Sequence, residues 1–201
     1  MRFTINSGEG VPIRGNLDVP RHARALVILI HGFEGFKDWG FFPWLAECLR
    51  DDKFAICRFT MSGDTTKVQL ADLRAVVAHC QKRLPIPTFL LGHSRGGGVA
   101  ILGASEVANL RGVVTWSAIA DADILAAASH LDVPLLVVHG KRDATVPVGQ
   151  SSKIAAQARD ASRLLIGGAS HTFNAIHPLV HVPRALELAE AVSARFFTAY
   201  A

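Results

Sequence analysis

Six short apolar runs, spread along most of the chain, set the strongest limit on its fold. They lack the polar residue at every second position that marks a strand with one face in water. They therefore predict strands that are buried on both faces, as in a parallel sheet. In chain order the runs are 25–30, 54–59, 88–91, 113–116, 135–138 and 164–166.

The segments between several of these runs have the spacing of helices. Each of three groups of apolar residues predicts one amphipathic helix. The groups are Phe42, Leu45, Ala46 and Leu49; then Leu70, Leu73, Val77 and Cys80; and finally Leu188, Val192 and Phe196 after Pro183. Strands and helices that alternate through right-handed crossovers build a three-layer α/β/α sandwich with a mostly parallel sheet. Its functional site is expected at the carboxyl ends of the strands.

The amino-terminal part predicts an antiparallel hairpin at the edge of this sheet. Its strands are 3–5 and 11–19, joined by a turn at residues 7–10. Only a short stretch separates Trp116 from Val133, so no cap domain is expected there. Because no repeat, low-complexity tract or linker interrupts the pattern, residues 1–201 are expected to form a single α/β domain.

The composition narrows the class of protein. Apolar residues make up 50% of the chain, and a net charge of +4 comes from scattered Lys and Arg, which argues against nucleic-acid binding. No stretch is long and apolar enough for a signal sequence or a membrane span, so we expect a cytoplasmic protein without a membrane partner. Cys48, Cys57 and Cys80 lack CxxC spacing and are predicted to be buried free thiols. The oligomeric state is not predicted.

Ser94 stands at the centre of residues 92–96 (Gly-His-Ser-Arg-Gly), directly after one apolar run and before a segment of helical composition. A GxSxG pattern between a strand and a helix is typical of a nucleophile elbow, whose strained turn raises the serine hydroxyl above the sheet. Gly92 and Gly96 would leave room for the close strand-to-helix approach. The alternative is a structural turn without a catalytic function.

A serine hydroxyl needs a base to take its proton and a carboxylate to orient that base. Asp143 follows the run at 135–138, and His171 follows the run at 164–166. Both are therefore predicted at the same edge of the sheet as Ser94, with Asp143 as the acid and His171 as the base. The alternative for Asp143 is a turn residue or a helix cap.

Other residues of the same types compete for these roles. Asp121 and Asp123 are better explained as caps of a helix that runs to Ser129, and His177 as a loop residue before Pro178. His181 is the remaining rival of His171. Another set of histidines ends the predicted strands, but no ligand spacing such as HExxH links them, so we predict no metal and no cofactor. These residues are His31, His93 and His139, which we expect to be neutral packing or hydrogen-bonding groups.

The order serine, aspartate, histidine on successive strands resembles the α/β-hydrolase superfamily over nearly the whole chain. The matching motifs are 31–33 (His-Gly-Phe), 92–97 (Gly-His-Ser-Arg-Gly-Gly), 140–143 (Gly-Lys-Arg-Asp) with 146–147 (Val-Pro), and 170–171 (Ser-His). The chain is most similar to the compact lidless esterases that include cinnamoyl and feruloyl esterases and dienelactone-hydrolase-like proteins. The resemblance implies that the backbone amides of Phe33 and Arg95 form the oxyanion hole.

The expected function is cleavage of a small-molecule carboxylic ester through an acyl-enzyme. Two alternatives remain: a thioesterase or peptidase with the same machinery, since all three pass through a similar oxyanion, and a non-catalytic small-molecule binder on the same scaffold. The dienelactone branch typically carries cysteine where Ser94 stands, which favours esters over lactones. Residues 60–65 form a shorter connection than the family pattern, so the shape of the pocket and the substrate are not predicted. Candidates for an apolar pocket are Phe33, Phe36, Trp39 and Phe173, although aromatic residues near strand ends are as often part of the core.

Overall fold

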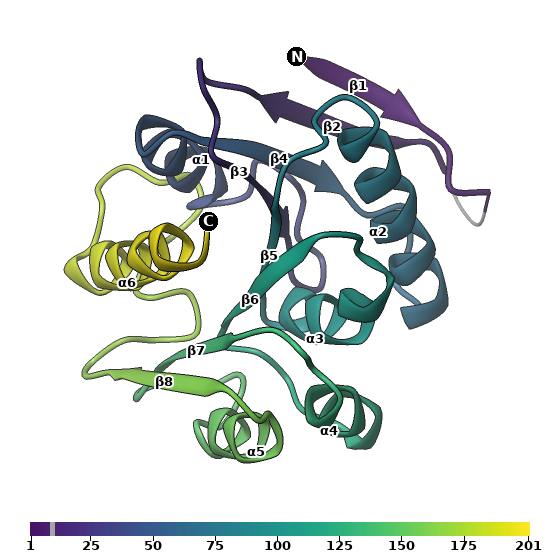
Figure 1. Cartoon of the computed structure of the whole chain (residues 1–201). Coiled ribbons are helices and arrows are strands. Elements are labelled where there is room, and N and C mark those ends of the chain that lie inside the picture. The colour runs from purple at the N-terminus through teal and green to yellow at the C-terminus, as the bar shows by residue number, and fades with distance from the viewer. Residues whose placement is uncertain (9–10) are drawn as a thin grey trace.

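The computed structural model describes residues 1–8 and 11–201, and these build one eight-stranded sheet (Figure 1). Its order is β1-β2-β4-β3-β5-β6-β7-β8. The strands are β1 (Arg2–Ile5), β2 (Ile13–Asp18), β3 (Ala25–Ile30), β4 (Phe54–Thr60), β5 (Thr88–His93), β6 (Leu110–Trp116), β7 (Leu135–Gly140) and β8 (Ala161–Ile166). The strands from β4 across to β8 are parallel, whereas β1 with β2 and β2 with β4 are antiparallel.

These pairings confirm the predicted mostly parallel sheet and its amino-terminal hairpin. The predicted turn at 7–10 lies partly outside the described residues. Between β6 and β7 there is one short helix and no cap, as predicted.

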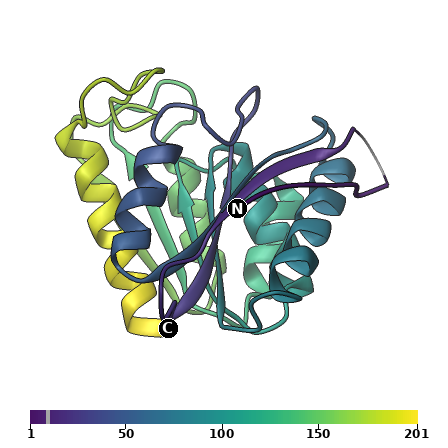
Figure 2. The ribbon, with the colours of Figure 1, turned by 90° about the horizontal axis from the view of Figure 1, so that it is seen from above.

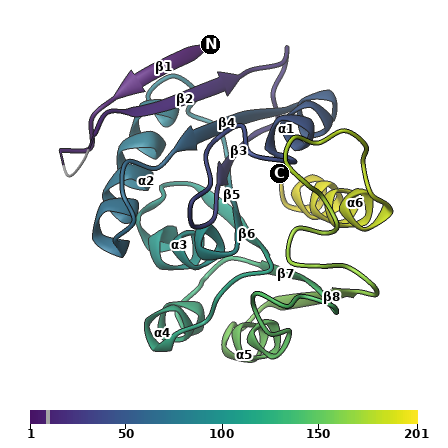
Figure 3. The same cartoon turned by 180° about the vertical axis from the view of Figure 1, so that it is seen from behind.

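Helices cover both faces of the sheet and make the predicted three layers (Figures 1 and 3). One face carries α1 (Phe42–Asp51) and α6 (Arg184–Tyr200). The opposite face carries α2 (Thr66–Gln81), α3 (Arg95–Gly103), α4 (Ala122–Ser129) and α5 (Gly149–Gln157), with a short 3₁₀ helix, η1 (Ala104–Glu106), after α3.

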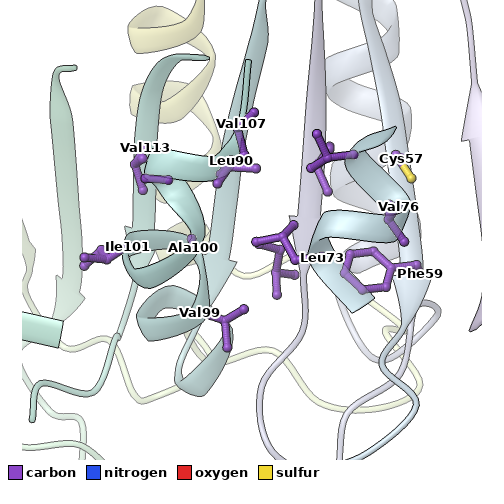
Figure 4. Close-up of a cluster of buried hydrophobic side chains, with 14 of the residues drawn as sticks. Cys57, Phe59, Leu73, Val76, Leu90, Val99, Ala100, Ile101, Val107 and Val113 are labelled. Carbon is purple, nitrogen blue, oxygen red and sulfur yellow. The ribbon is translucent and has the colours of Figure 1, made fainter. Parts of the chain in front are cut away.

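The core is split by the sheet into two apolar layers, because successive side chains of a strand point to opposite faces. In β3, Leu26 and Ile28 enter the layer beneath α2 and α3, whereas Val27 and Leu29 enter the layer beneath α1 and α6. Figure 4 shows part of the first layer, with side chains of α2 and α3 against those of β4 and β5. Both faces of the central strands are therefore buried from solvent, which explains why their sequences are apolar without interruption.

Helix α6 was predicted correctly, but its packing face was not. Leu188, one of the residues that predicted it, is 41% exposed, whereas Ala189 and Ser193 are fully buried. Small side chains at these positions let the helix lie close to the sheet, and Ser193 Oγ accepts a hydrogen bond from Trp116 Nε1 at 3.0 Å. The large apolar residues therefore predict the presence of the helix correctly, but they do not identify which of its faces is buried.

The three cysteines are free. Cys57 and Cys80 are buried as predicted, but the prediction of burial was wrong for Cys48, which is only half-buried on α1. Partial burial, reinforced by nearby carboxylates, raises the pKa of Cys48 to about 11. None of the described helices combines the length and the apolar character needed to cross a bilayer.

Because the strands are parallel, the loops after β3, β5, β7 and β8 leave the same edge of the sheet. Figure 2 shows the long loops that precede α1 and α6 on this edge. The fold thus brings together residues that lie far apart in the chain.

Candidate active site

Ser94 directly follows β5 and precedes α3 in a strained backbone conformation, with φ 56° and ψ −121°. A residue with a side chain rarely adopts a positive φ, and such strain persists only where the surroundings impose it. Here the Ser94 amide donates to the Trp116 carbonyl at 2.8 Å, and its carbonyl accepts from the Gly97 amide at 3.0 Å. Ser94 is therefore held in a sharp turn at the end of the strand.

The glycines around this turn allow the chain to pack without space for a Cβ. A Cβ on Gly92 would overlap the Gly96 carbonyl, and one on Gly96 would overlap the Ile30 carbonyl. A Cβ on Gly32 would lie 3.0 Å from that of Ser94, so the loop after β3 runs directly beside the serine. The close approach predicted for Gly92 and Gly96 is thus observed.

The loops after β7 and β8 bring Asp143 and His171 into contact. His171 Nδ1 donates to Asp143 Oδ2 at 2.8 Å. The other carboxylate oxygen accepts from the backbone amides of Thr145 at 2.9 Å and Val146 at 2.8 Å. Burial alone would raise the pKa of Asp143, but the Val146 amide, the His171 ring and the Thr145 amide together lower it. The carboxylate is therefore ionised at neutral pH.

Ser94 and His171 line one cavity of about 350 Å³. The side chain of Asp143 is fully buried behind His171. The remaining lining residues are His31, Gly32, Phe33, Glu34, Gly35, Trp39, Phe42, His93, Thr145 and Thr172. A larger cavity, of about 440 Å³, lies between α3, α4 and the start of β6 and contains none of the predicted catalytic residues.

The predicted oxyanion-hole residues are Phe33, in the loop after β3, and Arg95, directly after Ser94. Phe33 is in the turn closed by a 3.1 Å hydrogen bond from the Gly35 amide to the Gly32 carbonyl. Arg95 is the first residue of α3, where unpaired amides and the helix dipole favour negative charge. The Arg95 guanidinium also lies 5.8 Å from the centre of the Phe33 ring, so the two side chains contact each other.

Only some of the predicted aromatic residues border this cavity. Phe33 and Trp39 do, together with Phe42. Phe36 instead packs edge-on against His177, and Phe173 is fully buried against Trp116. The pocket prediction was therefore wrong for Phe36 and Phe173, since one belongs to the loop surface and the other to the core.

His31 connects the loop after β3 to the short connection at 60–65. Its Nε2 accepts from the Met61 amide at 2.9 Å, so its Nδ1 carries the hydrogen that faces the Gly32 carbonyl at 2.7 Å. Burial lowers the pKa of His31. A neutral imidazole therefore fixes the backbone next to Phe33.

The short connection itself is tied to α2 rather than to the cavity. Asp72 accepts from the Ser62 amide at 2.5 Å and from the Ser62 hydroxyl at 2.9 Å, and Thr65 caps the helix. Residues 60–65 contribute none of the cavity lining.

His93 contacts the backbone of His171, the predicted base. Its Nε2 lies 3.0 Å from the His171 carbonyl oxygen, which can only accept a hydrogen bond. Burial, followed by repulsion from His171, lowers the pKa of His93 to about 4. His93 is therefore neutral at neutral pH and holds the backbone of His171 by donating to it.

His139 is a buried hydrogen-bonding group, as predicted, but its contact with Asp143 was not predicted. Its Nε2 lies 3.0 Å from the Val146 carbonyl oxygen and 3.1 Å from Asp143 Oδ2. Both neighbours are acceptors, so Nε2 carries a hydrogen. The side chains of His139 and Asp143 are both 0% exposed. His139 thus holds the turn at 143–146 and lies near the same carboxylate oxygen that His171 contacts. Its sequence signal is its position at the end of a strand, four residues before Asp143.

We predict that His139→Leu lowers kcat about 10- to 100-fold, because it removes a buried donor beside Asp143. His139→Gln carries an amide donor near the same place and should keep most of the activity. Steady-state kinetics and thermal unfolding of both variants check this prediction. Equal kcat values for the leucine and glutamine variants would contradict the positioning role.

The competing residues lie elsewhere. Asp121 is the N-cap of α4 and accepts from the Ile124 amide at 2.9 Å, and Asp123 is in the first turn of that helix, as predicted. His177 Nδ1 accepts from the Gly40 amide at 2.9 Å, outside the 350 Å³ cavity. His181 is exposed. Among the described residues, no three or more His, Cys, Asp or Glu side chains form a group that could hold a metal ion.

The sequence of residues 50–201, which includes Ser94, Asp143 and His171, matches the Dienelactone hydrolase family. The chain belongs to the dienelactone hydrolase family. Family membership makes the protein a hydrolase. No curated protein matches it in sequence.

Solved structures share the fold over the full chain. The dienelactone hydrolase from Anabaena variabilis has a TM-score of 0.86 at 20% identity and covers 100% of this chain and 97% of its own. Est1E from Butyrivibrio proteoclasticus, solved with ferulic acid bound, has a TM-score of 0.84 at 20% identity, over 98% of both chains. XC6422 from Xanthomonas campestris is described as an α/β serine hydrolase without lid. It has a TM-score of 0.78 at 19% identity, and the match covers 100% of this chain and 94% of XC6422. The lidless α/β-hydrolase fold and the predicted resemblance are confirmed.

Proposed function

We propose that this hydrolase cleaves carboxylic esters through an acyl-enzyme formed on Ser94. The observation that carries the proposal is the 2.8 Å hydrogen bond between His171 and Asp143, with His171 and Ser94 lining one cavity. A serine beside a histidine that a buried carboxylate orients is the arrangement that activates a hydroxyl at neutral pH.

The orientation of His171 assigns its two nitrogens different tasks. Because Nδ1 donates to Asp143, Nε2 is the nitrogen without a hydrogen and can take the proton of Ser94 Oγ. As that proton moves, Oγ forms a bond to the ester carbonyl carbon, whose oxygen becomes an anion. Asp143 remains ionised and stabilises the charged imidazolium that results.

In the steps that follow, His171 first acts as an acid and then again as a base. His171 gives its proton to the alcohol as the carbonyl–oxygen bond of the ester breaks, which leaves an acyl group on Ser94. Water then loses a proton to His171 and attacks the acyl carbon, and Ser94 is released with its hydroxyl restored. In both steps the amides of Phe33 and Arg95 are the proposed donors to the oxyanion.

The activated serine can be tested by intact-mass analysis after treatment with a fluorophosphonate. We expect one adduct on the wild type and none on Ser94→Ala. Rates on an acetyl ester, an acyl thioester and a peptide anilide then compare the three reaction classes. The proposal expects the ester to be cleaved fastest. Absence of any adduct and of any turnover would favour the alternative of a non-catalytic binder.

We also predict that activity shows no interfacial activation. The stretch between β6 and β7 folds into α4 without a cap, so no lid has to open before a substrate reaches the 350 Å³ cavity. The rate on a long-chain ester should rise smoothly as its concentration passes the micellar threshold. A sharp increase at that threshold would contradict this prediction.

A further inference from the structure

Glu34 places a carboxylate on the wall of the candidate active-site cavity. Of the described residues that line the 350 Å³ cavity, Glu34 is the only one of the Asp, Glu, Lys and Arg types. The wall beside it is aromatic, from Phe33, Trp39 and Phe42. A substrate that enters the cavity therefore meets one carboxylate on an otherwise uncharged and largely apolar surface.

The neighbouring charges do not cancel this carboxylate. Lys37 and Arg58 both pair with Asp38, further along the same loop. Arg95 lies over the Phe33 ring and is not among the cavity-lining residues. Within the described part of the chain, no hydrogen bond or ion pair involves the Glu34 side chain.

The backbone at Glu34 adopts a turn conformation that a glutamate rarely takes. Its φ is 53°, and it lies with Phe33 at the centre of the turn closed by Gly35 and Gly32. Glycine or asparagine is favoured at a turn position with positive φ, whereas a glutamate is disfavoured there. A strained residue at a functional site points to a use for its side chain.

We propose that Glu34 selects substrates by charge, so that the site accepts esters with neutral or cationic groups and discriminates against esters that carry a carboxylate. The inference rests on the proposed ester hydrolysis. Glu34 is exposed, so water and salt screen part of its field, but it still repels a negative charge that a bound substrate holds several ångströms away. The same geometry attracts a cation.

The test compares three aryl acetates: phenyl acetate, 3-carboxyphenyl acetate and 3-(trimethylammonio)phenyl acetate. The quantity measured is the ratio of kcat/KM for the cationic ester to kcat/KM for the anionic ester. Intrinsic reactivities cancel when this ratio in a variant is divided by that in the wild type. We expect Glu34→Gln to lower the ratio about 5- to 20-fold, and added salt to lower it in the wild type.

Two further variants separate charge from structure. Asp123→Asn removes an exposed carboxylate from the first turn of α4, at the same edge of the sheet and outside the cavity, and should leave the ratio unchanged. Glu34→Gly removes the charge and relieves the positive φ, so it should lower the ratio as Glu34→Gln does while the Tm stays the same or rises. A purely structural role would change the Tm without any dependence on substrate charge.

The outcomes are distinct. A ratio that is unchanged in Glu34→Gln and Glu34→Gly, while wild-type protein hydrolyses phenyl acetate, overturns the charge selection and leaves the proposed function intact. If phenyl acetate is not hydrolysed and fluorophosphonate does not label Ser94, the proposed function fails and the charge selection falls with it.

Discussion

Ser94→Ala is expected to lower kcat by about 10⁴- to 10⁶-fold, the largest effect of any single substitution in this chain. Alanine cannot form the acyl-enzyme, so only binding and oxyanion stabilisation remain to accelerate direct attack by water. Because the hydroxyl is not needed to hold the substrate before reaction, KM should change much less than kcat.

Thermal unfolding distinguishes this loss of chemistry from a loss of fold. Alanine tolerates the backbone of residue 94 about as poorly as serine does, so the Tm of Ser94→Ala should stay near that of the wild type. Ser105→Ala, in η1 directly after α3, is the matched control and should keep full activity. Fluorophosphonate labelling of Ser94→Ala at the wild-type level would show that another residue is the nucleophile.

The predicted strands were most accurate where the sheet is buried on both sides. The run at 25–30 coincides with β3, whose residues are all buried. β6 begins at Leu110 rather than at 113, because Arg111 lies at an exposed start of the strand. β8 begins at Ala161 rather than at 164, because an edge strand tolerates exposed polar residues. Apolar runs therefore identify the strands, but they underestimate their exposed ends.

The placement of Ser94, Asp143 and His171 at one edge of the sheet was predictable because it depends on topology. Parallel strands that end at one edge bring Asp143 and His171 together wherever the intervening helices lie. The contributions of His139 and Glu34 depend on how individual turns fold. The contact of His139 requires the Val146 carbonyl to point toward β7, and the position of Glu34 requires a positive φ at that residue. Neither property can be read from residue type or spacing.

Asp143→Asn is expected to lower kcat about 10⁴-fold, because no orientation of an amide satisfies its neighbours. One carboxylate oxygen accepts from the amides of Thr145 and Val146, and the other accepts from His171 and lies near the His139 hydrogen. An amide nitrogen placed toward His171 requires Nδ1 to accept, which moves the hydrogen to Nε2 and blocks the base. An amide nitrogen placed toward the turn faces two backbone donors.

The same substitution has a signature in the pH dependence of stability. Since the pKa of Asp143 is lower in the folded protein than its ordinary value, its ionised form stabilises the fold above a pH of about 4. This contribution is lost as the pH falls through the folded-state pKa. The difference in free energy of unfolding between wild type and Asp143→Asn should therefore be constant near neutral pH and shrink in acid.

Denaturant unfolding at several pH values, with exposed Asp132→Asn as control, measures this difference. Nearly full activity of Asp143→Asn, or a stability difference that does not change with pH, would show that another residue orients His171.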